Sequence, residues 1–303
     1  MAVPFSKLDN WEMNATLFQG SIFIEENHKK KLDSRDEQQS QREGPGVPSQ
    51  DLMSYWGYKF ETLSLLPQPW YQTTREYIET REDQIVSNYA QYCSVVRTGF
   101  GKIKMIIGGE VDALWDVKPE DTSRPINWVE LKTSAEIFNE RDQIKFERKL
   151  LKFWAQSFLL GVPKIIVGFR SHDGILHRLE ELDTQSIPEK VQRQGKNLWD
   201  GQICINFAAA FLECKSISCV DPAYLTLAGL KNTITEEGVW RIRKPEKVPR
   251  IEVFKLEETG HGDILSANFV DWRTSGLPKV LKLKNEKLAA ESNVPGPSVL
   301  NPP

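Results

Sequence analysis

Four ionisable residues stand in two pairs on neighbouring apolar segments of the sequence. Glu110 and Asp112 follow the run MIIGG, and Glu130 and Lys132 lie in the next apolar segment, with the turn-rich KPEDTSRP between them. Side chains two positions apart on a strand lie on the same face. A hairpin of the two segments would therefore bring three carboxylates and one ammonium together. In a partly buried place, crowded carboxylates need a cation or another partner.

The residue types indicate which cation and which chemistry. Carboxylate oxygens without nearby His or Cys select magnesium or manganese rather than zinc. Such an ion orients water and stabilises charge on a phosphoryl group, and Lys132 would position or activate the water, or stabilise the developing charge. An Asp, a hairpin interval and then Glu-x-Lys is typical of PD-(D/E)xK nucleases. A solvated hairpin, with a cross-strand ion pair from Lys132 to Glu110 or Asp112, is the alternative.

Two further polar positions fit the same site. Glu61 ends the aromatic segment YWGYKFE, and we interpret it as another carboxylate of the site; a strand-end side chain in solvent is the alternative. Lys149, Lys152 and Gln156 recur at helical spacing beside an apolar face. This stripe would contact a phosphate backbone, with Gln156 reaching into the site, or it is the solvated side of an amphipathic helix.

The elements that must position these residues alternate between strands and helices. The pattern predicts an α/β fold of the mixed α+β kind, in which helices flank central mixed and antiparallel sheets. We expect strands at 55–67, 102–117, 126–134 and 163–170 and in two parts of 238–258, and helices from near 74 to before 99, at 139–161 and at 197–217.

Length and charge limit the organisation and the partners. The 303 residues show no repeat, so we predict a single catalytic domain at 1–283, with a mobile polar loop at 25–50 and a disordered tail at 284–303. A net charge of −3 argues against nonspecific coating of nucleic acid, so any polyanion site is local, with the basic segment 141–170 as candidate. The four cysteines lack zinc spacing. No uncharged run approaches the roughly 18 residues of a membrane span, so we expect no membrane partner.

Several ordered motifs carry a family resemblance. The succession GYKFE, GEVDALW, WVELKTS and then a helix with WAQSFLLGVPKIIVGFR resembles the DXO/Rai family of eukaryotic RNA 5′-end quality-control enzymes. WEMNATLFQGSIFIEE and GILHRLEELDTQSIP are similar to that family too, so the resemblance covers most of residues 5–260. It implies a PD-(D/E)xK nuclease-like core.

The resemblance also implies an activity and roles for single residues. The activity is removal of incorrect RNA 5′ ends: pyrophosphate release from 5′-triphosphate RNA, removal of incompletely methylated caps and NAD caps, and in some members 5′-to-3′ exonuclease action. Catalysis would fall to Glu110, Asp112, Glu130 and Lys132. Glu61, Asp112 and Glu130 would ligate magnesium or manganese, Glu110 would act near the metal through water, and Gln156, Lys132 and Glu61 would contact the substrate.

Other expectations follow from the same resemblance. Family members carry an upstream region with a substrate-contacting arginine motif, which we do not find in this chain. A second function would be binding: some members stabilise a nuclear 5′-to-3′ exoribonuclease, so we expect such a partner, and the nucleus as location with the cytoplasm as alternative. From the chemistry alone, a DNA-cleaving nuclease is a third interpretation.

Overall fold

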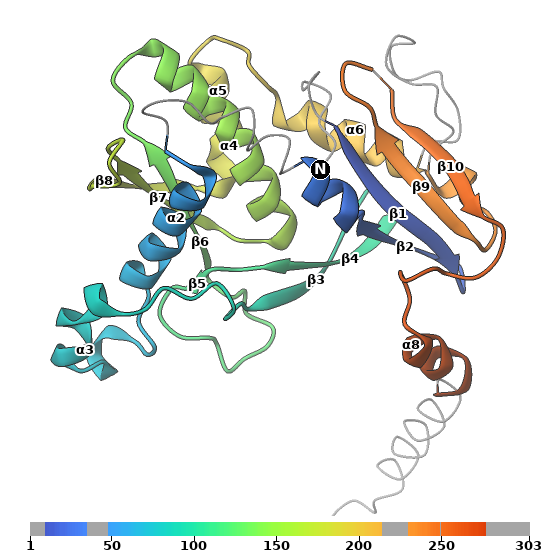
Figure 1. Cartoon of the computed structure of the whole chain (residues 1–303), viewed down its shortest axis with the longest axis horizontal. Coiled ribbons are helices and arrows are strands. Elements are labelled where there is room, and N and C mark those ends of the chain that lie inside the picture. The colour runs from blue at the N-terminus through green and yellow to red at the C-terminus, as the bar shows by residue number, and fades with distance from the viewer. Residues whose placement is uncertain (1–9, 35–47, 214–229, 249, 277–303) are drawn as a thin grey trace, which may run out of the picture. The chain divides into compact units, whose positions relative to one another are not determined.

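The computed structural model describes residues 10–34, 48–213, 230–248 and 250–276 (Figure 1). The chain divides into two compact units, which comprise 1–11, 28–233 and 244–251 in the first and 12–27, 234–243 and 252–303 in the second. The expected tail lies outside the described residues, as do residues 35–47 of the expected mobile loop, while 28–34 is helical. The expectation of one catalytic domain at 1–283 stays a prediction.

A four-stranded mixed sheet forms the centre of the first unit, in the order β5-β6-β7-β8. Its strands are β5 (Ala113–Leu114), β6 (Trp128–Ala135), β7 (Lys164–Arg170) and β8 (Leu176–Asp183). β6 and β7 are parallel, with Glu130 opposite Ile165, whereas the outer pairs are antiparallel. The mixed α/β class is therefore confirmed. Because β5 pairs only with the start of β6, the rest of that side of β6 is an open edge in the part of the chain that the structure describes.

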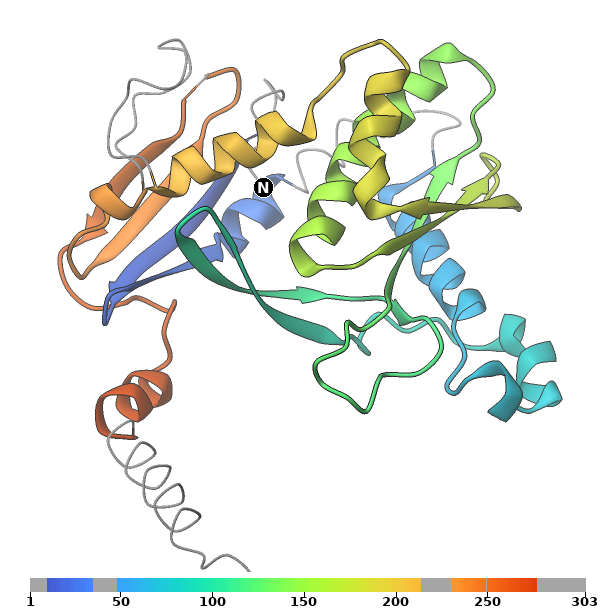
Figure 2. The same ribbon diagram turned by 180° about the vertical axis from the view of Figure 1, so that it is seen from behind.

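Helix α4 (Glu140–Leu160) makes the crossover between the two parallel strands (Figure 2). Asn139 caps its start by accepting a hydrogen bond from the Asp142 amide, and Gly161 ends it in the left-handed conformation at φ 71°. Its apolar stripe, with Leu150 and Trp154, packs on Ile165 and the other α4-facing side chains of β7. The predicted helix 139–161 and strand 163–170 are both confirmed.

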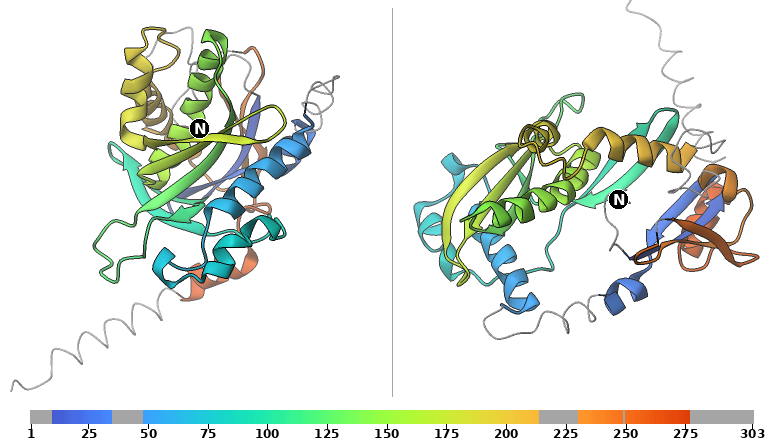
Figure 3. Two further views of the ribbon diagram at one scale, coloured as in Figure 1. Left: turned by 90° about the vertical axis from the view of Figure 1, so that its left-hand side faces the viewer. Right: turned by 90° about the horizontal axis from the view of Figure 1, so that it is seen from above.

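Helix α2 (Gln50–Ser64) covers the opposite face of this sheet (Figure 3). Its buried Phe60 packs against Val129 and Leu131 of β6. The predicted strand at 55–67 is therefore wrong. Ser49 caps the helix by accepting from the Leu52 amide, and Trp56 and Phe60, one helical turn apart, both contact the sheet, which outweighs the aromatic content of the segment.

A two-stranded antiparallel sheet, β3 (Cys93–Phe100) with β4 (Ile103–Glu110), packs on the C-terminal part of α4. The predicted long helix before Gly99 is wrong. Only α3 (Arg75–Glu79) is α-helical there, and the β-branched run from Cys93 alternates between exposed and half-buried side chains, the period of a strand. A Cβ on Gly109 would lie 2.7 Å from Leu160, so the glycine allows β4 to approach α4 closely.

The first unit is completed by short elements and three further helices. These are the 3-10 turns Trp70–Gln72, Arg81–Asp83 and Thr184–Ser186, and the helices α5 (Ile187–Arg193), α6 (Gly201–Glu213) and α7 (Leu230–Thr233). The described part of the predicted helix 197–217 is thus helical from Gly201, and residues 214–217 lie outside it. In the described residues, we find no helix long and apolar enough for a membrane span.

The second unit is built on an antiparallel sheet in the order β10-β9-β1-β2. Its strands are β1 (Trp11–Phe18), β2 (Ser21–Glu26), β9 (Val239–Lys244) and β10 (Glu252–Glu257), and α8 (Ala267–Asp271) with the π-turn Trp272–Gly276 follows. The two strands predicted within 238–258 are confirmed. Buried Thr16 ties the unit together, since its hydroxyl donates to the Gly238 carbonyl and lies 2.9 Å from His261 Nδ1.

Candidate functional site

Glu130 is the most buried carboxylate of the site. It lies on β6 and faces α4, and its side chain is 0% exposed. One oxygen, Oε1, pairs with the Lys132 ammonium and accepts a hydrogen bond of 2.8 Å from Gln156 Nε2 of α4. The other oxygen, Oε2, is buried without a hydrogen-bond partner among the described residues. A buried carboxylate oxygen of this kind is costly, so it indicates a group that the protein meets only in function.

Asp112 lies in the link before β5, and its side chain contacts the open edge of β6. Its Oδ2 accepts a hydrogen bond of 2.7 Å from the Leu131 amide and lies 3.8 Å from Lys132 Nζ. The Asp112 side chain is only 9% exposed. Asp112 therefore flanks the Lys132 ammonium from the link before β5, and Glu130 flanks it from β6.

The predicted hairpin forms only in part. β4 ends at Glu110 and pairs with β3, and β5, which pairs with β6, begins at Ala113. Glu110 and Asp112 thus do not share one strand, because buried Val111 turns the chain from one sheet to the next, and Glu110 itself is exposed. The Lys132–Asp112 ion pair exists, as the solvated alternative required, but full burial of Glu130 excludes a solvated hairpin.

Glu61 approaches the same group from the last turn of α2. The pKa of its carboxyl is raised to about 7, first by burial and then by the negative charge of Asp112, with smaller effects of the same sign from Glu110 and Glu130. Lys132 acts in the opposite direction. The charges of the other three predicted carboxylates therefore all raise the pKa of Glu61, although the segment that carries Glu61 is a helix and not the expected strand.

The cluster has more negative than positive charge. Burial raises the pKa of Glu130, and the Lys132 ammonium only partly offsets this effect. The pKa of Lys132 lies above its usual value. Burial alone would lower this pKa, but the negative charges of Glu130 and Asp112 together outweigh burial. Lys132 is therefore held as a cation by its two neighbours.

The donor set fits a hard divalent cation by its chemistry. It consists of carboxylates, one of which has a buried oxygen without a partner, and its excess negative charge is what such an ion neutralises. As the side chains stand, no three His, Cys, Asp or Glu residues in the described ranges are arranged to hold an ion. The ammonium of Lys132 lies against Glu130 and near Asp112 instead, so the individual ligand roles stay predictions.

Contacts just beyond the cluster were not anticipated from the sequence. Lys149 Nζ of α4 donates to Ser134 Oγ over 3.2 Å, and Ser134 lies on the same face of β6 as Lys132. Arg170, at the end of β7, lies over the Trp56 ring with its guanidinium carbon 4.1 Å from the ring centroid. Lys149 belonged to the predicted polar stripe, but the sequence did not predict its contact with Ser134 or the contact of Arg170 with Trp56.

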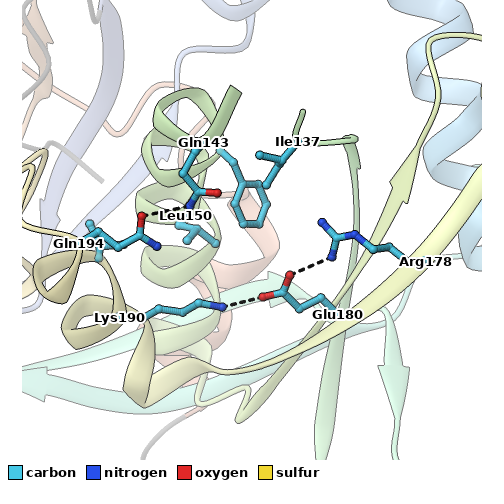
Figure 4. Close-up of a pocket in the computed structure, with 9 residues that line it drawn as sticks. Ile137, Gln143, Leu150, Arg178, Glu180, Lys190 and Gln194 are labelled. Atoms are coloured by element: carbon cyan, nitrogen blue, oxygen red, sulfur yellow. Dashed lines mark hydrogen bonds and ion pairs between the residues drawn. The ribbon is translucent and has the colours of Figure 1, made fainter. Parts of the chain in front are cut away.

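A separate cavity of about 300 Å³ lies beside β8, between α4 and α5 (Figure 4). In Figure 4, Arg178 and Lys190 both point at Glu180, and Gln143 meets Gln194. None of the predicted site residues lines this cavity, so it is distinct from the carboxylate cluster.

Comparisons with known proteins agree with this geometry. Residues 1–270 match a family model described as RAI1 like PD-(D/E)XK nuclease. The decapping nuclease RAI1 of Aspergillus fumigatus is 62% identical over 274 residues, which are 90% of this chain and 70% of that protein. The crystal structure of Scheffersomyces stipitis Rai1 with (3′-NADP)+ and calcium is similar with a TM-score of 0.74 at 28% identity, over 90% of this chain and 70% of that one.

A second solved structure is similar to the same extent. It is Candida albicans Rai1 in complex with pU5-Mn2+, with a TM-score of 0.72 at 28% identity, over 90% of this chain and 71% of that one.

Proposed function

This chain belongs to the RAI1-like PD-(D/E)XK nuclease family, and on that premise we propose how its carboxylate cluster works as a metal-dependent hydrolase of RNA 5′ ends. The observation that carries the proposal is Glu130, fully buried between Lys132 and Gln156 with its second oxygen unpartnered. Glu147 of α4 also has a buried oxygen without a partner in the described residues, so what distinguishes Glu130 is that it shares the Lys132 ammonium with a second carboxylate, Asp112.

The residues divide the work according to their surroundings. Glu61, Asp112 and Glu130 are the proposed metal ligands, and exposed Glu110 acts from the rim through water. A divalent ion bound there supplies an activated water and stabilises charge on the phosphoryl group. Gln156 fixes the Glu130 carboxylate by donating to Oε1. It is also the proposed contact for the 5′ end of the substrate.

The ion pairs of Lys132 determine which catalytic role it can have. Two carboxylates flank its ammonium, so we propose that it stabilises the negative charge developing on the phosphoryl oxygens. Accepting a proton from water would require a neutral amine, which this environment disfavours. Of the alternatives left open by the sequence, charge stabilisation is the one that the geometry favours.

We propose magnesium or manganese as the ion in the working enzyme. The two solved relatives hold calcium and manganese, which supports a hard divalent ion with oxygen ligands. For the substrate, pU5 in one relative and (3′-NADP)+ in the other support RNA 5′ ends that include NAD caps.

A second function is proposed on the resemblance alone. The chain would bind and stabilise a nuclear 5′-to-3′ exoribonuclease, and it would then work in the nucleus. Co-purification at micromolar concentration tests the partner, and its absence there would contradict this function. Imaging of the tagged chain in its own cells tests the location, which a purely cytoplasmic signal would contradict.

The decisive experiment for the hydrolase is pyrophosphate release from 5′-triphosphate RNA with manganese or magnesium. Wild type should release pyrophosphate, and Glu130→Gln should not, because the neutral amide keeps the shape but cannot hold the ion. Undiminished release by a folded Glu130→Gln protein would contradict the proposed site. Duplex DNA as competitor separates RNA 5′-end hydrolysis from a DNA-cleaving nuclease.

A further inference from the structure

Basic side chains gather at the far end of the open edge of β6. Lys149 donates to Ser134 Oγ, two positions after Lys132 on the same face and thus about 7 Å further along the strand. Arg170 ends the neighbouring strand β7, opposite Ala135 in the register. Lys149 lies on the α4 face of the sheet and Arg170, stacked on Trp56, lies on the α2 face, so basic side chains are present on both faces at the strand ends beyond the carboxylate cluster.

Within the described residues, neither Lys149 nor Arg170 forms an ion pair with an Asp or Glu side chain. Surrounding protein atoms displace water from the Lys149 ammonium, and Arg170 and Lys145 add like charge, so its pKa lies below the usual value. Arg178 and Lys190 beside β8, by contrast, are both paired with Glu180.

Arg170 is also held in one orientation. Its guanidinium lies over the Trp56 ring of α2, and Nη1 donates to the Ser171 carbonyl over 3.1 Å. Its Nε is buried without a hydrogen-bond partner in the described part of the chain. Because a stacked guanidinium loses little further freedom on binding, this arrangement suits an oxyanion such as a phosphate.

The spacing indicates an extended ligand. Lys149 and Gln156 are seven residues apart on α4, which is two turns on one side of the helix and roughly 10 Å. A single phosphate is too small to reach from Glu130 to Lys149. A chain of phosphates whose first member lies in the carboxylate cluster reaches both.

We propose that Lys149 and Arg170 bind the backbone phosphates of the RNA that follows the 5′-terminal group held at the carboxylate cluster. This inference rests on the proposed function and adds to it a source of affinity for the RNA body. The contacts go to backbone and not to bases, so they act whichever cap or sequence the RNA carries.

The test compares substrates of two lengths. Lys149→Gln, Arg170→Gln and the combined variant are assayed with a 5′-triphosphate dinucleotide and a 5′-triphosphate ten-nucleotide RNA in manganese. Arg148→Gln, one residue along the same helix and exposed, removes the same charge and is the control. Lys149→Arg keeps the charge and should retain activity.

For the longer RNA, we expect KM to rise roughly fivefold to tenfold per residue with kcat unchanged, while the dinucleotide changes less than about twofold. Binding of the 3′-labelled ten-nucleotide RNA in EDTA, followed by fluorescence anisotropy, should weaken equally. The slope of log affinity against log salt should fall by about 1 per residue.

Two results would overturn the inference. One is an equal loss with the dinucleotide, which would place the cations at the terminal group or in the fold. The other is wild-type binding and salt slope in the combined variant. The EDTA arm needs no hydrolysis. Hydrolysis with unchanged binding in the variants would therefore remove only this inference, whereas no hydrolysis by wild type would remove the proposed function.

Discussion

Two charged clusters lie on the α4 face of the same sheet and differ in how their charges are matched. Beside β8, Glu180 pairs with both Arg178 and Lys190. On β6, Glu130 shares one lysine with Asp112 and keeps one oxygen unpartnered. The charges of the first cluster are matched by ion pairs, as is usual for charged side chains that only support the fold. The second is charged in a way that folding alone does not explain.

The two glutamates titrate in opposite directions for this reason. Burial acts to raise the pKa of both, but the hydrogen bonds from Lys190 and Arg178 bring Glu180 below its usual value. Glu130 stays above its usual value despite Lys132, with Asp112 adding negative charge. Two carboxylates that share one lysine are thus a better sign of function than a buried carboxylate by itself, because Glu147 of α4 is also buried with an unpartnered oxygen and lies outside the cluster.

Neutralising each glutamate in turn should give the largest contrast. Glu130→Gln should lower decapping or pyrophosphate release at least about 100-fold, because it removes a proposed metal ligand and the partner of Lys132. Its free energy of unfolding should stay equal or rise, because the raised pKa of Glu130 means that the folded chain disfavours the charge, and Lys132 keeps Asp112 as a partner. Glu180→Gln should do the reverse, with normal activity and slightly lower stability. Kinetics and urea unfolding of both variants check this. Equal activity losses in the two variants would contradict the proposed difference between the two clusters.

Packing of α2 should come next in size. A Cβ on Gly168 would lie 2.8 Å from Phe60 and 2.9 Å from Leu176, so Gly168→Ala should push α2 away from the sheet. We expect about 1–3 kcal/mol of destabilisation and a loss of activity, because Glu61 sits one residue after Phe60. Adding Phe60→Leu should recover part of both. A stable, fully active Gly168→Ala protein would show that the position of α2 is not critical for the site.

The sequence was informative where a local pattern carries the structure. Amphipathic α4 and buried β7 followed from periodicity and from Asn139 and Gly161 at the ends of the helix. The Glu-x-Lys pair was placed correctly on one strand because alternation is a property of the strand itself. The mixed sheet followed from the order of such elements.

Where aromatic content competed with periodicity, the prediction failed. The segment around Phe60 was predicted to be a strand, although Ser49 caps a helix there and Trp56 and Phe60 are one helical turn apart. The hairpin was predicted from two apolar runs, but strand pairing also depends on partners distant in sequence. β4 pairs with β3, and only Ala113 and Leu114 of β5 pair with β6. The unpartnered oxygen of Glu130 and the stacking of Arg170 on Trp56 are likewise properties of packing, which one sequence does not contain.

Glu61 should make stability depend on pH in the metal-free protein. Its pKa is raised from 4.5 to about 7 in the folded chain, so the unfolded chain loses this proton first. The free energy of unfolding should therefore fall as pH rises from about 4.5 to about 7. Urea unfolding in EDTA should show that Glu61→Gln flattens this decline, and that manganese stabilises wild type more at pH 7 than at pH 5.

The matched control for Glu61 is Glu120→Gln, at an exposed loop carboxylate. It should leave the decline of wild type unchanged. Asp112→Asn should weaken the decline, because the charge of Asp112 is one cause of the raised pKa. A wild-type curve that is flat between these pH values would contradict the crowding of carboxylates at this site.

The matched cluster beside β8 should give the smallest effect. In a double-mutant cycle of Arg178→Gln and Glu180→Gln, we expect a coupling of about 0.5 kcal/mol, because both side chains are partly exposed and salt screens the pair. The coupling should shrink further in high salt, and activity should stay at the wild-type level in all three variants. A loss of activity here would mean that this cavity communicates with the carboxylate cluster through α4. The two clusters would then be parts of one functional unit, and matched charge would no longer indicate a purely structural role.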